Sequence, residues 1–330
     1  MATIRNIYLN VDIMSTRFKY LYTVDIYMSF IEKQRHGKHF YYYLVKSVRI
    51  TPIKAKKLRI FLGREIPKQE ELQKYFVELE KRTIEAQYHA KWLPPGLVER
   101  VDDLSASITV FHKTPSNALP KDFMVRYTYN TNAIEGNRLT LRQTALVLSD
   151  RIAPEGARAD DVIEALNAVD AWNFIKSYRG RLNKAFVCKV QYEITKNTSC
   201  RIQGSYRDGE VRISGSEHIP PKPGKVPKLL EELFKEFYNQ KKALHPIELA
   251  TFLHNSFVNI HPFTDGNGRT SRLLMNWIML RNKLPPVIIE VTNKEQYYNA
   301  IEAADKRDQK PFATFLCNQL LAQYTVSISG

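Results

Sequence analysis

The sequence predicts a mainly α-helical fold that is preceded by a small N-terminal β-region. Two observations predict the helical part. Apolar residues recur at helical spacing through most of the chain after residue 67, and the segment 273–280 is apolar almost all round, as in a buried central helix. The β-region is predicted by apolar and aromatic residues that alternate with other residues before residue 63. The 330 residues, 44% of them hydrophobic, suffice for one large or two modest domains with packed cores.

The β-region contains two expected pairs of strands. Residues 20–28 alternate in polarity, and residues 40–45 are a dense run of strand formers, with Gly37 at the expected hairpin tip. Residues 48–50 and 58–62 look like a second pair. Basic residues interleaved with these aromatic ones suit a platform for nucleic acid. They equally suit a small sheet with one packed face and one solvated face, and this second interpretation is favoured.

The net charge of +15 is unevenly distributed along the chain. Residues 1–70 hold 14 Lys and Arg against 5 Asp and Glu, an excess of +9. Attraction to nucleic acid or to an acidic protein is one interpretation, and a solvated basic face without a partner is the other, favoured one. There is no apolar run as long as a membrane span and no signal-peptide core, and the three cysteines match no metal spacing. A reduced, cytoplasmic protein with no membrane association is the expectation.

Helices are expected through the middle of the chain. Helical spacing runs from residue 67 toward 88 and, after a Pro-Pro-Gly break, from 99 to 111. A helix over 127–137 ends at Gly136, a common C-cap residue, and carries Glu135 near its C-terminus, against the preference of the helix dipole. Further helices are expected at 157–178 and 183–194, at 228–240, and around the apolar residues between 297 and 320.

Residues 204–215 are expected to form a β-hairpin. Asp208 and Gly209 lie between β-prone residues and indicate its turn. The exposed edge of such a hairpin can bind an extended peptide by strand addition. An ordinary surface hairpin is the alternative.

The stretch 244–280 carries the most specific pattern in the chain. An apolar helix leads to twelve residues, HPFTDGNGRTSR at 261–272, and a buried helix follows. Gly266 and Gly268 let successive backbone N–H groups converge on an anion at the start of that second helix, where the helix dipole already favours phosphate. The segment therefore predicts a polyanion site, although it lacks the glycine-lysine-serine/threonine ending of a Walker loop.

Four charged or titratable residues complete this site. Arg269 and Arg272 are three apart on the first turn of the second helix and can bind different phosphates of one chain. Asp265 beside phosphates would be unfavourable without a cation, which predicts Mg²⁺ between its carboxylate and the phosphate oxygens. His261, at the other end of the loop, is placed to take a proton near neutral pH.

The pattern His-Pro-Phe-x-Asp-Gly-Asn-Gly-Arg-x-x-Arg matches, without a departure, the signature of the Fic family of AMP-transferases. The resemblance extends over roughly residues 182–316. Fic proteins are mostly helical, with a β-hairpin flap over the active loop, and they typically move AMP from ATP to a serine, threonine or tyrosine hydroxyl of a protein. The resemblance implies that His261 is the general base, that Asp265 holds Mg²⁺ and that Phe263 anchors the loop in the core.

The resemblance also implies which residues contact the nucleotide. The α- and β-phosphates would be lined by Gly266, Asn267 and Gly268, and the β- and γ-phosphates neutralised by Arg269 and Arg272. In the flap, the candidates that line the nucleotide are Ile213, Ser214 and Gly215. A tyrosine pair, Tyr297 and Tyr298, resembles the family position that borders the adenine, with plain aromatic packing as the alternative.

An upstream motif adds a regulatory expectation. Fic proteins with an inhibitory helix carry the pattern Ser/Thr-x-x-x-Glu-Gly/Asn, which Thr131, Glu135 and Gly136 resemble fully. The resemblance implies that Glu135 takes Arg272 by a two-pronged hydrogen bond and so displaces the γ-phosphate.

The prediction as a whole has three regions: a basic N-terminal β-region at 1–66, a helical region at 67–182 with the inhibitory helix 127–137, and a Fic catalytic domain at 183–318. The predicted activity is protein adenylyltransfer that uses ATP and Mg²⁺, is autoinhibited by Glu135 and acts on an unidentified protein, the chain itself included. Removal of AMP, transfer of another phosphate-containing group, and a role as a nucleic-acid-binding regulator are the alternatives. Self-association of the chain stays open.

Overall fold

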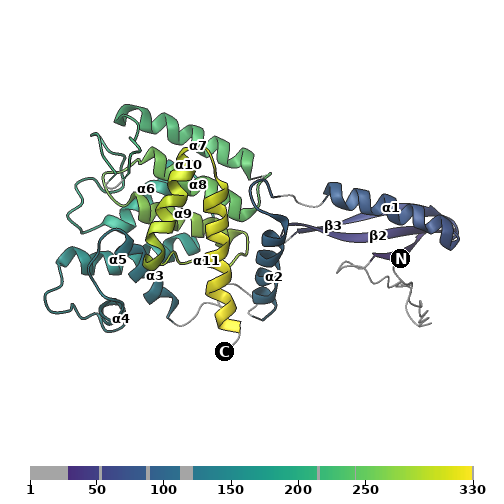
Figure 1. The fold of residues 1–330 in the computed structure, drawn as a ribbon, viewed down its shortest axis with the longest axis horizontal. Helices are drawn as coiled ribbons and strands as arrows, with labels where there is room; N and C mark the ends of the chain where they lie inside the picture. The colour runs from purple at the N-terminus through teal and green to yellow at the C-terminus, as the bar shows by residue number, and fades with distance from the viewer. Residues whose placement is uncertain are drawn as a thin grey trace. The chain divides into compact units, whose positions relative to one another are not determined.

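The computed structural model describes residues 29–51, 54–86, 90–111, 122–213, 216–241 and 243–328. The chain divides into two compact units, Met1–His89 and Ala90–Gly330 (Figure 1). The strand expected at 20–28 lies outside the described residues. The finer division at residues 66 and 182 stays a prediction.

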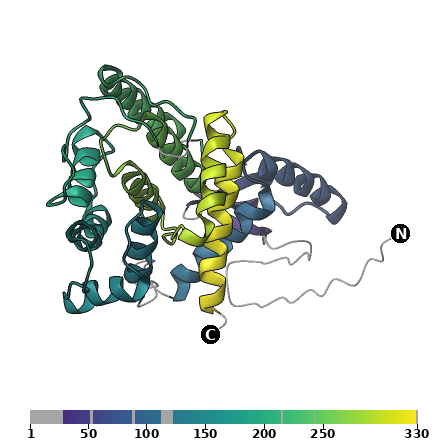
Figure 2. The same ribbon diagram turned by 60° about the vertical axis from the view of Figure 1, so that its left-hand side comes forward.

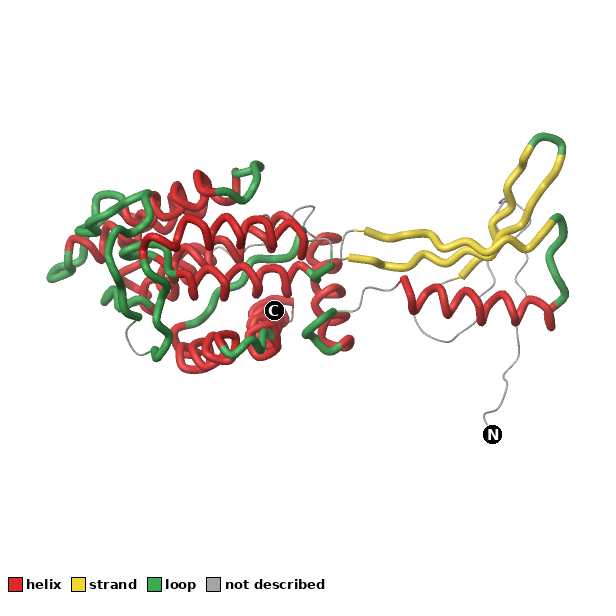
Figure 3. Tube along the Cα trace, turned by 90° about the horizontal axis from the view of Figure 1, so that it is seen from above, coloured by secondary structure: helices red, strands yellow, loops and turns green. Residues whose placement is uncertain are grey.

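The first unit contains a three-stranded antiparallel sheet in the order β1-β2-β3. Its elements are β1 (Ser29–His36), β2 (His39–Thr51), β3 (Lys54–Gly63) and α1 (Gln69–Ala86). Gly37 has φ of 62° at the tip of the first hairpin, where the sequence places it. Helix α1 runs beside the strands of this sheet (Figure 3). The register pairs Leu44 with both Ile31 and Ile60, and these side chains pack in one cluster with Leu79 of α1. One face of the sheet is therefore packed, as the favoured interpretation requires.

The second unit is helical. Its helices in chain order are α2 (Pro95–Phe111), α3 (Phe123–Ile134), α4 (Leu141–Asp150), α5 (Ala159–Ser177), α6 (Lys184–Thr195), α7 (Val226–Gln240), α8 (Pro246–Ile260), α9 (Asn267–Arg281), α10 (Lys294–Asp305) and α11 (Lys310–Ile328). A mainly α-helical fold with a small N-terminal sheet is confirmed. Across the described part of the chain, no helix has the length and apolar character needed to cross a membrane.

Helix α9 forms the centre of the second unit, with α3, α5, α6 and α8 packed around it (Figures 1 and 2). Its residues from Arg269 to Met279 are all buried, which explains why the sequence is apolar almost all round. Helix α8 begins with Pro246 in its first turn and a reciprocal cap between His245 and Glu248. It ends at His261, whose φ of 49° turns the chain into the loop that leads to α9.

Two local expectations differ from the structure. The described residues of the expected hairpin, 204–213, form bends and irregular segments, and none of them is in a strand. Side-chain hydrogen bonds to neighbouring elements hold this segment in place of a strand ladder. Helix α4 was not expected, although Thr140 and Gln143 form a capping box that the Thr-x-x-Gln spacing could have indicated.

Candidate active site

His261 closes α8 with its imidazole in a defined tautomer. Its backbone N–H donates to the Phe257 carbonyl at 3.0 Å, and its Nδ1 lies 3.3 Å from the Val258 carbonyl oxygen. Because a carbonyl oxygen can only accept, Nδ1 carries the proton and Nε2 keeps its lone pair. The side chain is thus oriented to take a proton at Nε2.

Burial lowers the pKa of His261 to about 4, while the Val258 carbonyl and the Glu135 carboxylate act to raise it. The Arg207 guanidinium acts in the same direction as burial. His261 is therefore neutral at physiological pH, which is the form that a general base requires.

The loop after His261 is held by its own side chains. Phe263 is fully buried against Phe257 and Tyr206, consistent with its expected role as an anchor. Asn267 accepts from the Phe263 N–H and donates to the Phe263 carbonyl, both at 2.9 Å. Both polar groups of the Asn267 side chain bind the Phe263 backbone, so a phosphate would contact the backbone of Asn267 and not its side chain. Gly266 has φ of 79°, and a Cβ there would lie only 3.2 Å from a methyl group of Thr195.

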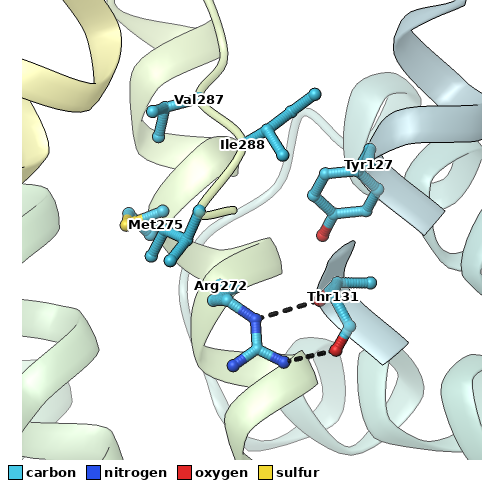
Figure 4. Close-up of a pocket in the computed structure, with 7 residues that line it drawn as sticks. Tyr127, Thr131, Arg272, Met275, Val287 and Ile288 are labelled. Atoms are coloured by element: carbon cyan, nitrogen blue, oxygen red, sulfur yellow. Dashed lines mark hydrogen bonds between the residues drawn. The ribbon is translucent and has the colours of Figure 1, made fainter. Parts of the chain in front are cut away.

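Arg272 is 2% exposed and points into the contact between α9 and α3. Its Nε donates to Thr131 Oγ1 at 2.9 Å and its Nη2 to the Thr131 carbonyl at 2.8 Å (Figure 4). The same Nη2 donates to Glu135 Oε1 at 2.7 Å. The expected pair between Arg272 and Glu135 is present, but the two-pronged geometry is wrong. A single hydrogen bond joins the carboxylate to the guanidinium, because Thr131 takes Nε and Tyr297 takes Nη1.

Glu135 lies against the first turn of α9. A Cβ added at Gly268 would overlap the Glu135 carboxylate, so a side chain at this position would require that carboxylate to move. The carboxylate stands where the N-terminus of α9 favours an anion. Gly136 follows with φ of 99°, and it ends α3 as the sequence predicts.

The two tyrosines have different surroundings. Tyr297 is 1% exposed, and its hydroxyl lies 3.3 Å from Arg272 Nη1 and 2.9 Å from His254 Nε2. It therefore supports Arg272 from within the core. Tyr298 is 40% exposed, with its hydroxyl 3.5 Å from the Ile134 carbonyl at the end of α3. Of the two tyrosines, only Tyr298 has an exposed surface against which an adenine could pack.

Arg207 fixes the segment that precedes the expected flap contacts, and the sequence did not single it out. It is 3% exposed; its Nε donates to the His261 carbonyl at 2.8 Å, and its backbone N–H donates to the Pro262 carbonyl at 2.9 Å. Ile213 is half-buried further along, whereas Ser214 and Gly215 lie outside the described residues.

Gln191 of α6 joins the same segment to the loop. Its Oε1 accepts from the Gly204 N–H at 2.5 Å, and its Nε2 donates to the Asp265 carbonyl at 3.2 Å. Buried arginine and glutamine side chains carry no pattern that distinguishes them in a single sequence, so neither residue could be found before the structure.

Asp265 is the residue available for a metal ion. Its side chain is 53% exposed and accepts from Arg269 Nη2 at 3.1 and 3.2 Å. Among the described residues, no three His, Cys, Asp or Glu side chains cluster as a protein-only metal site would. A single exposed carboxylate fits Mg²⁺, which keeps several water ligands and is usually shared between one or two carboxylates and substrate phosphates.

A model of the Fic/DOC family matches residues 181–279, which include the whole segment from His261 to Arg272. The chain carries a Fic domain. Thr131 and Glu135 lie upstream of the matched residues. They contact the Fic domain because α3 packs against α9.

Curated relatives of the chain include two named protein adenylyltransferase Fic. The relative from Aedes aegypti is 34% identical over 204 residues, which are 60% of this chain and 40% of the relative. The relative from Drosophila mojavensis is 34% identical over 227 residues, 66% of this chain and 44% of the relative. The chain thus spans less than half the length of these relatives.

Solved structures share the fold of the Fic domain and its upstream helices. A Fic domain containing signaling protein from Bacteroides thetaiotaomicron is 25% identical with a TM-score of 0.64, covering 69% of this chain and 95% of that protein. Fic-1 from C. elegans is also 25% identical with a TM-score of 0.64, covering 80% of this chain and 78% of that one.

Proposed function

We propose that this chain is a protein adenylyltransferase that moves AMP from ATP to a serine, threonine or tyrosine hydroxyl, and that Glu135 restrains the reaction. The observation that carries the proposal is the neutral His261, with Nε2 free, at one end of a loop whose other end bears two buried arginines at a helix N-terminus. The name shared by the curated relatives supports the same activity.

In the proposed reaction, the hydroxyl oxygen of the target attacks the α-phosphorus of ATP. His261 Nε2 takes the hydroxyl proton as the new P–O bond forms, and the bond from the α-phosphorus to the leaving pyrophosphate breaks. The low pKa of His261 keeps it neutral before the reaction. The negative charge of bound phosphates acts in the same direction as the Glu135 carboxylate and raises that pKa toward the useful range.

The first turn of α9 would hold the phosphates. The backbone N–H groups after Gly266 have no acceptor within the helix, and Arg269 and Arg272 would neutralise the β- and γ-phosphates as charge builds on the leaving group. Asp265 would hold Mg²⁺ together with the phosphates. When bound, the ion would neutralise part of the phosphate charge.

Glu135 would restrain the reaction by changing where the phosphates of ATP lie. Its carboxylate lies against Gly268 and takes Arg272 Nη2, so it competes with the terminal phosphate for the same cation and the same helix turn. A misplacement of about 1 Å can cost roughly 10²-fold in rate. Competition that only displaces the phosphate chain is therefore enough to hold the activity down.

The test is to incubate the purified Glu135→Gly variant with Mg²⁺ and ATP labelled at either the α- or the γ-phosphate. Protein labelling from the α-position alone is the expected result, with the chain itself as a substrate to be measured first. Labelling from the γ-position would indicate a kinase, and no labelling from either with a folded, ATP-binding protein would refute AMP transfer.

A further inference from the structure

Arg269 is held from two sides by carboxylates that differ in exposure. Its Nη1 donates to Glu164 Oε1 of α5 at 2.6 Å, and its Nη2 donates to Asp265 at 3.1 and 3.2 Å. The guanidinium is 4% exposed, and among the described residues its Nε has no hydrogen-bond partner. The orientation of Arg269 therefore depends on these two contacts.

Glu164 is the fixed contact. Its side chain is 17% exposed, and its second oxygen accepts from Asn137 Nδ2 at 2.8 Å. The same Nδ2 donates to the Asp161 carbonyl at 3.0 Å, one turn earlier in α5. Both oxygens of Glu164 are used, and the residue lies in the second turn of α5, so this carboxylate has little freedom to leave Arg269.

Asp265 is the exchangeable contact. It is 53% exposed and lies four residues from Arg269, and ion pairs at such exposed positions are weak because water screens them. A phosphate with two or more charges offers Nη2 a stronger partner. Glu164 thus leaves one edge of the guanidinium turned toward the loop, where a phosphate can replace Asp265.

We propose that Glu164 is a positioning residue for the nucleotide: it fixes Arg269 through Nη1 so that Nη2 faces the β- and γ-phosphates. The inference rests on the proposed function, because it requires a nucleotide in the loop. Glu164 lies outside the residues that match the Fic/DOC family, as does Glu135. Arg269 and Arg272 are therefore each paired with one carboxylate that lies upstream of the matched residues.

A purely structural role for Glu164, the neutralisation of a buried cation, predicts a different outcome. Loss of Glu164 would then weaken the whole site, and all adenine nucleotides would lose affinity alike. A positioning role predicts a loss only for ligands with phosphates beyond the α-position. ATP and AMP separate the two roles, because only ATP carries the β- and γ-phosphates.

The experiment measures calorimetric binding of ATP and of AMP to a His261→Ala, Glu135→Gly parent, in which transfer cannot consume the ligand. Adding Glu164→Ala should weaken ATP binding by roughly tenfold or more, as loss of residues that orient a binding group commonly does, and should leave AMP binding unchanged. The ATP affinity of the Glu164→Gln variant should lie between that of the parent and that of Glu164→Ala. Its side-chain oxygen can accept from Arg269, while its amide nitrogen faces the Asn137 donor. It also serves as the test if Glu164→Ala does not fold.

Glu193→Ala is the matched control. Glu193 of α6 is 13% exposed and pairs with Lys189 and Lys196, so its ion pairs are with lysines and not with the arginines of α9. Its loss should affect neither ligand. Equal losses for ATP and AMP in both Glu164 variants, or no loss in either, would overturn the positioning role. A parent that binds ATP but whose Glu135→Gly counterpart transfers no AMP would refute the proposed function alone, and a parent that binds no ATP would refute both.

Discussion

The C-terminal end of α3 and the second turn of α5 each bring one carboxylate to an arginine of α9, and they hold these arginines differently. Glu135 follows the last turn of α3, is 31% exposed and gives one oxygen to Arg272. Glu164 lies within α5, is 17% exposed and has both oxygens bonded. Helix termini open more readily than the turns inside a helix. The comparison indicates that Arg272 has an exchangeable partner and Arg269 a permanent one.

The two contacts should therefore respond to substitution with opposite signs. Loss of the exchangeable partner frees a cation for the nucleotide, whereas loss of the permanent one leaves a buried cation without orientation. The same type of residue, in the same type of ion pair, would restrain the reaction in one region and support it in the other.

The largest effect is expected from His261→Ala, because this residue belongs to neither carboxylate–arginine pair. Loss of the general base should reduce AMP incorporation on the order of 10²–10⁴-fold. ATP affinity should stay close to that of the Glu135→Gly chain, because His261 acts on the hydroxyl. The measurement is α-labelled AMP incorporation beside calorimetric ATP binding, in the Glu135→Gly background. An unchanged transfer rate would show that another group takes the proton.

The next effect is a gain, from Glu135→Gly. Freeing Arg272 and the first turn of α9 should raise AMP incorporation at least several-fold, since a displacement of about 1 Å is worth roughly 10²-fold in rate. Arg272→Ala should lower incorporation, and Glu135→Gly added to it should not restore the rate, because the freed partner no longer exists. Equal labelling by the unsubstituted chain and Glu135→Gly across ATP concentrations would show that Glu135 only ends a helix.

The sequence predicted the helices of the second unit well because their apolar spacing and end signals are local. Residues 246–260 and 267–281 carry Pro, Gly and apolar residues in positions that determine where each helix begins and ends. The hairpin at 204–215 was predicted from a turn dipeptide and β-prone neighbours. Its described residues are held by contacts to other elements: Arg207 donates to the His261 carbonyl, and Gly204 donates to Gln191 of α6. No local pattern reports these contacts.

The site was predictable where the motif is contiguous and was not where it depends on packing. Thr131 and Glu135 were expected near Arg272 only through a family resemblance, and the structure places them there. Glu164 is 105 residues from Arg269 in the chain, and an acidic residue on a helix is usually solvated. Tyr297 was expected near the adenine, yet its burial depends on how α10 packs against α8, which periodicity does not specify.

A smaller and separable effect concerns the pKa of His261, and it tests the comparison directly. Glu135 raises that pKa, which burial lowers to about 4, whereas Glu164 is not among the groups that act on it. Glu135→Gln should therefore lower the pKa of His261 further, and Glu164→Gln should leave it unchanged. Titration of the imidazole by NMR measures both. Equal shifts of the His261 pKa in the two variants would contradict the different roles of the Glu135 and Glu164 carboxylates.

The same pKa sets the direction of the change in stability with pH. The folded pKa of His261 lies below its unfolded value of about 6.5. Its contribution to stability is thus present above pH 6.5 and is lost as pH falls toward 4, at up to about 1.4 kcal/mol per pH unit. Fully buried His254, with its pKa lowered to about 3, acts in the same direction. Urea unfolding between pH 4 and 7.5 should show this fall, and His261→Gln should reduce it.

The smallest effect is expected from removing the first compact unit. Its apolar residues pack among themselves, with Leu79 of α1 against the sheet, in a cluster separate from the core around α9. Within the described part of the chain, the side chains that contact Arg269 and Arg272 all come from residue 127 or later. Deleting residues 1–89 should therefore leave self-labelling of the Glu135→Gly variant unchanged.

Deleting only residues 1–62 is the informative comparison, because it leaves α1 without the sheet that it packs against. Solubility should then fall, while the labelling rate of the soluble fraction stays unchanged. If residues 90–330 fold by circular dichroism yet no longer label, the sheet takes part in the site. If labelling holds while salt-dependent binding to nucleic acid is lost, the basic first unit binds a partner independently of the reaction.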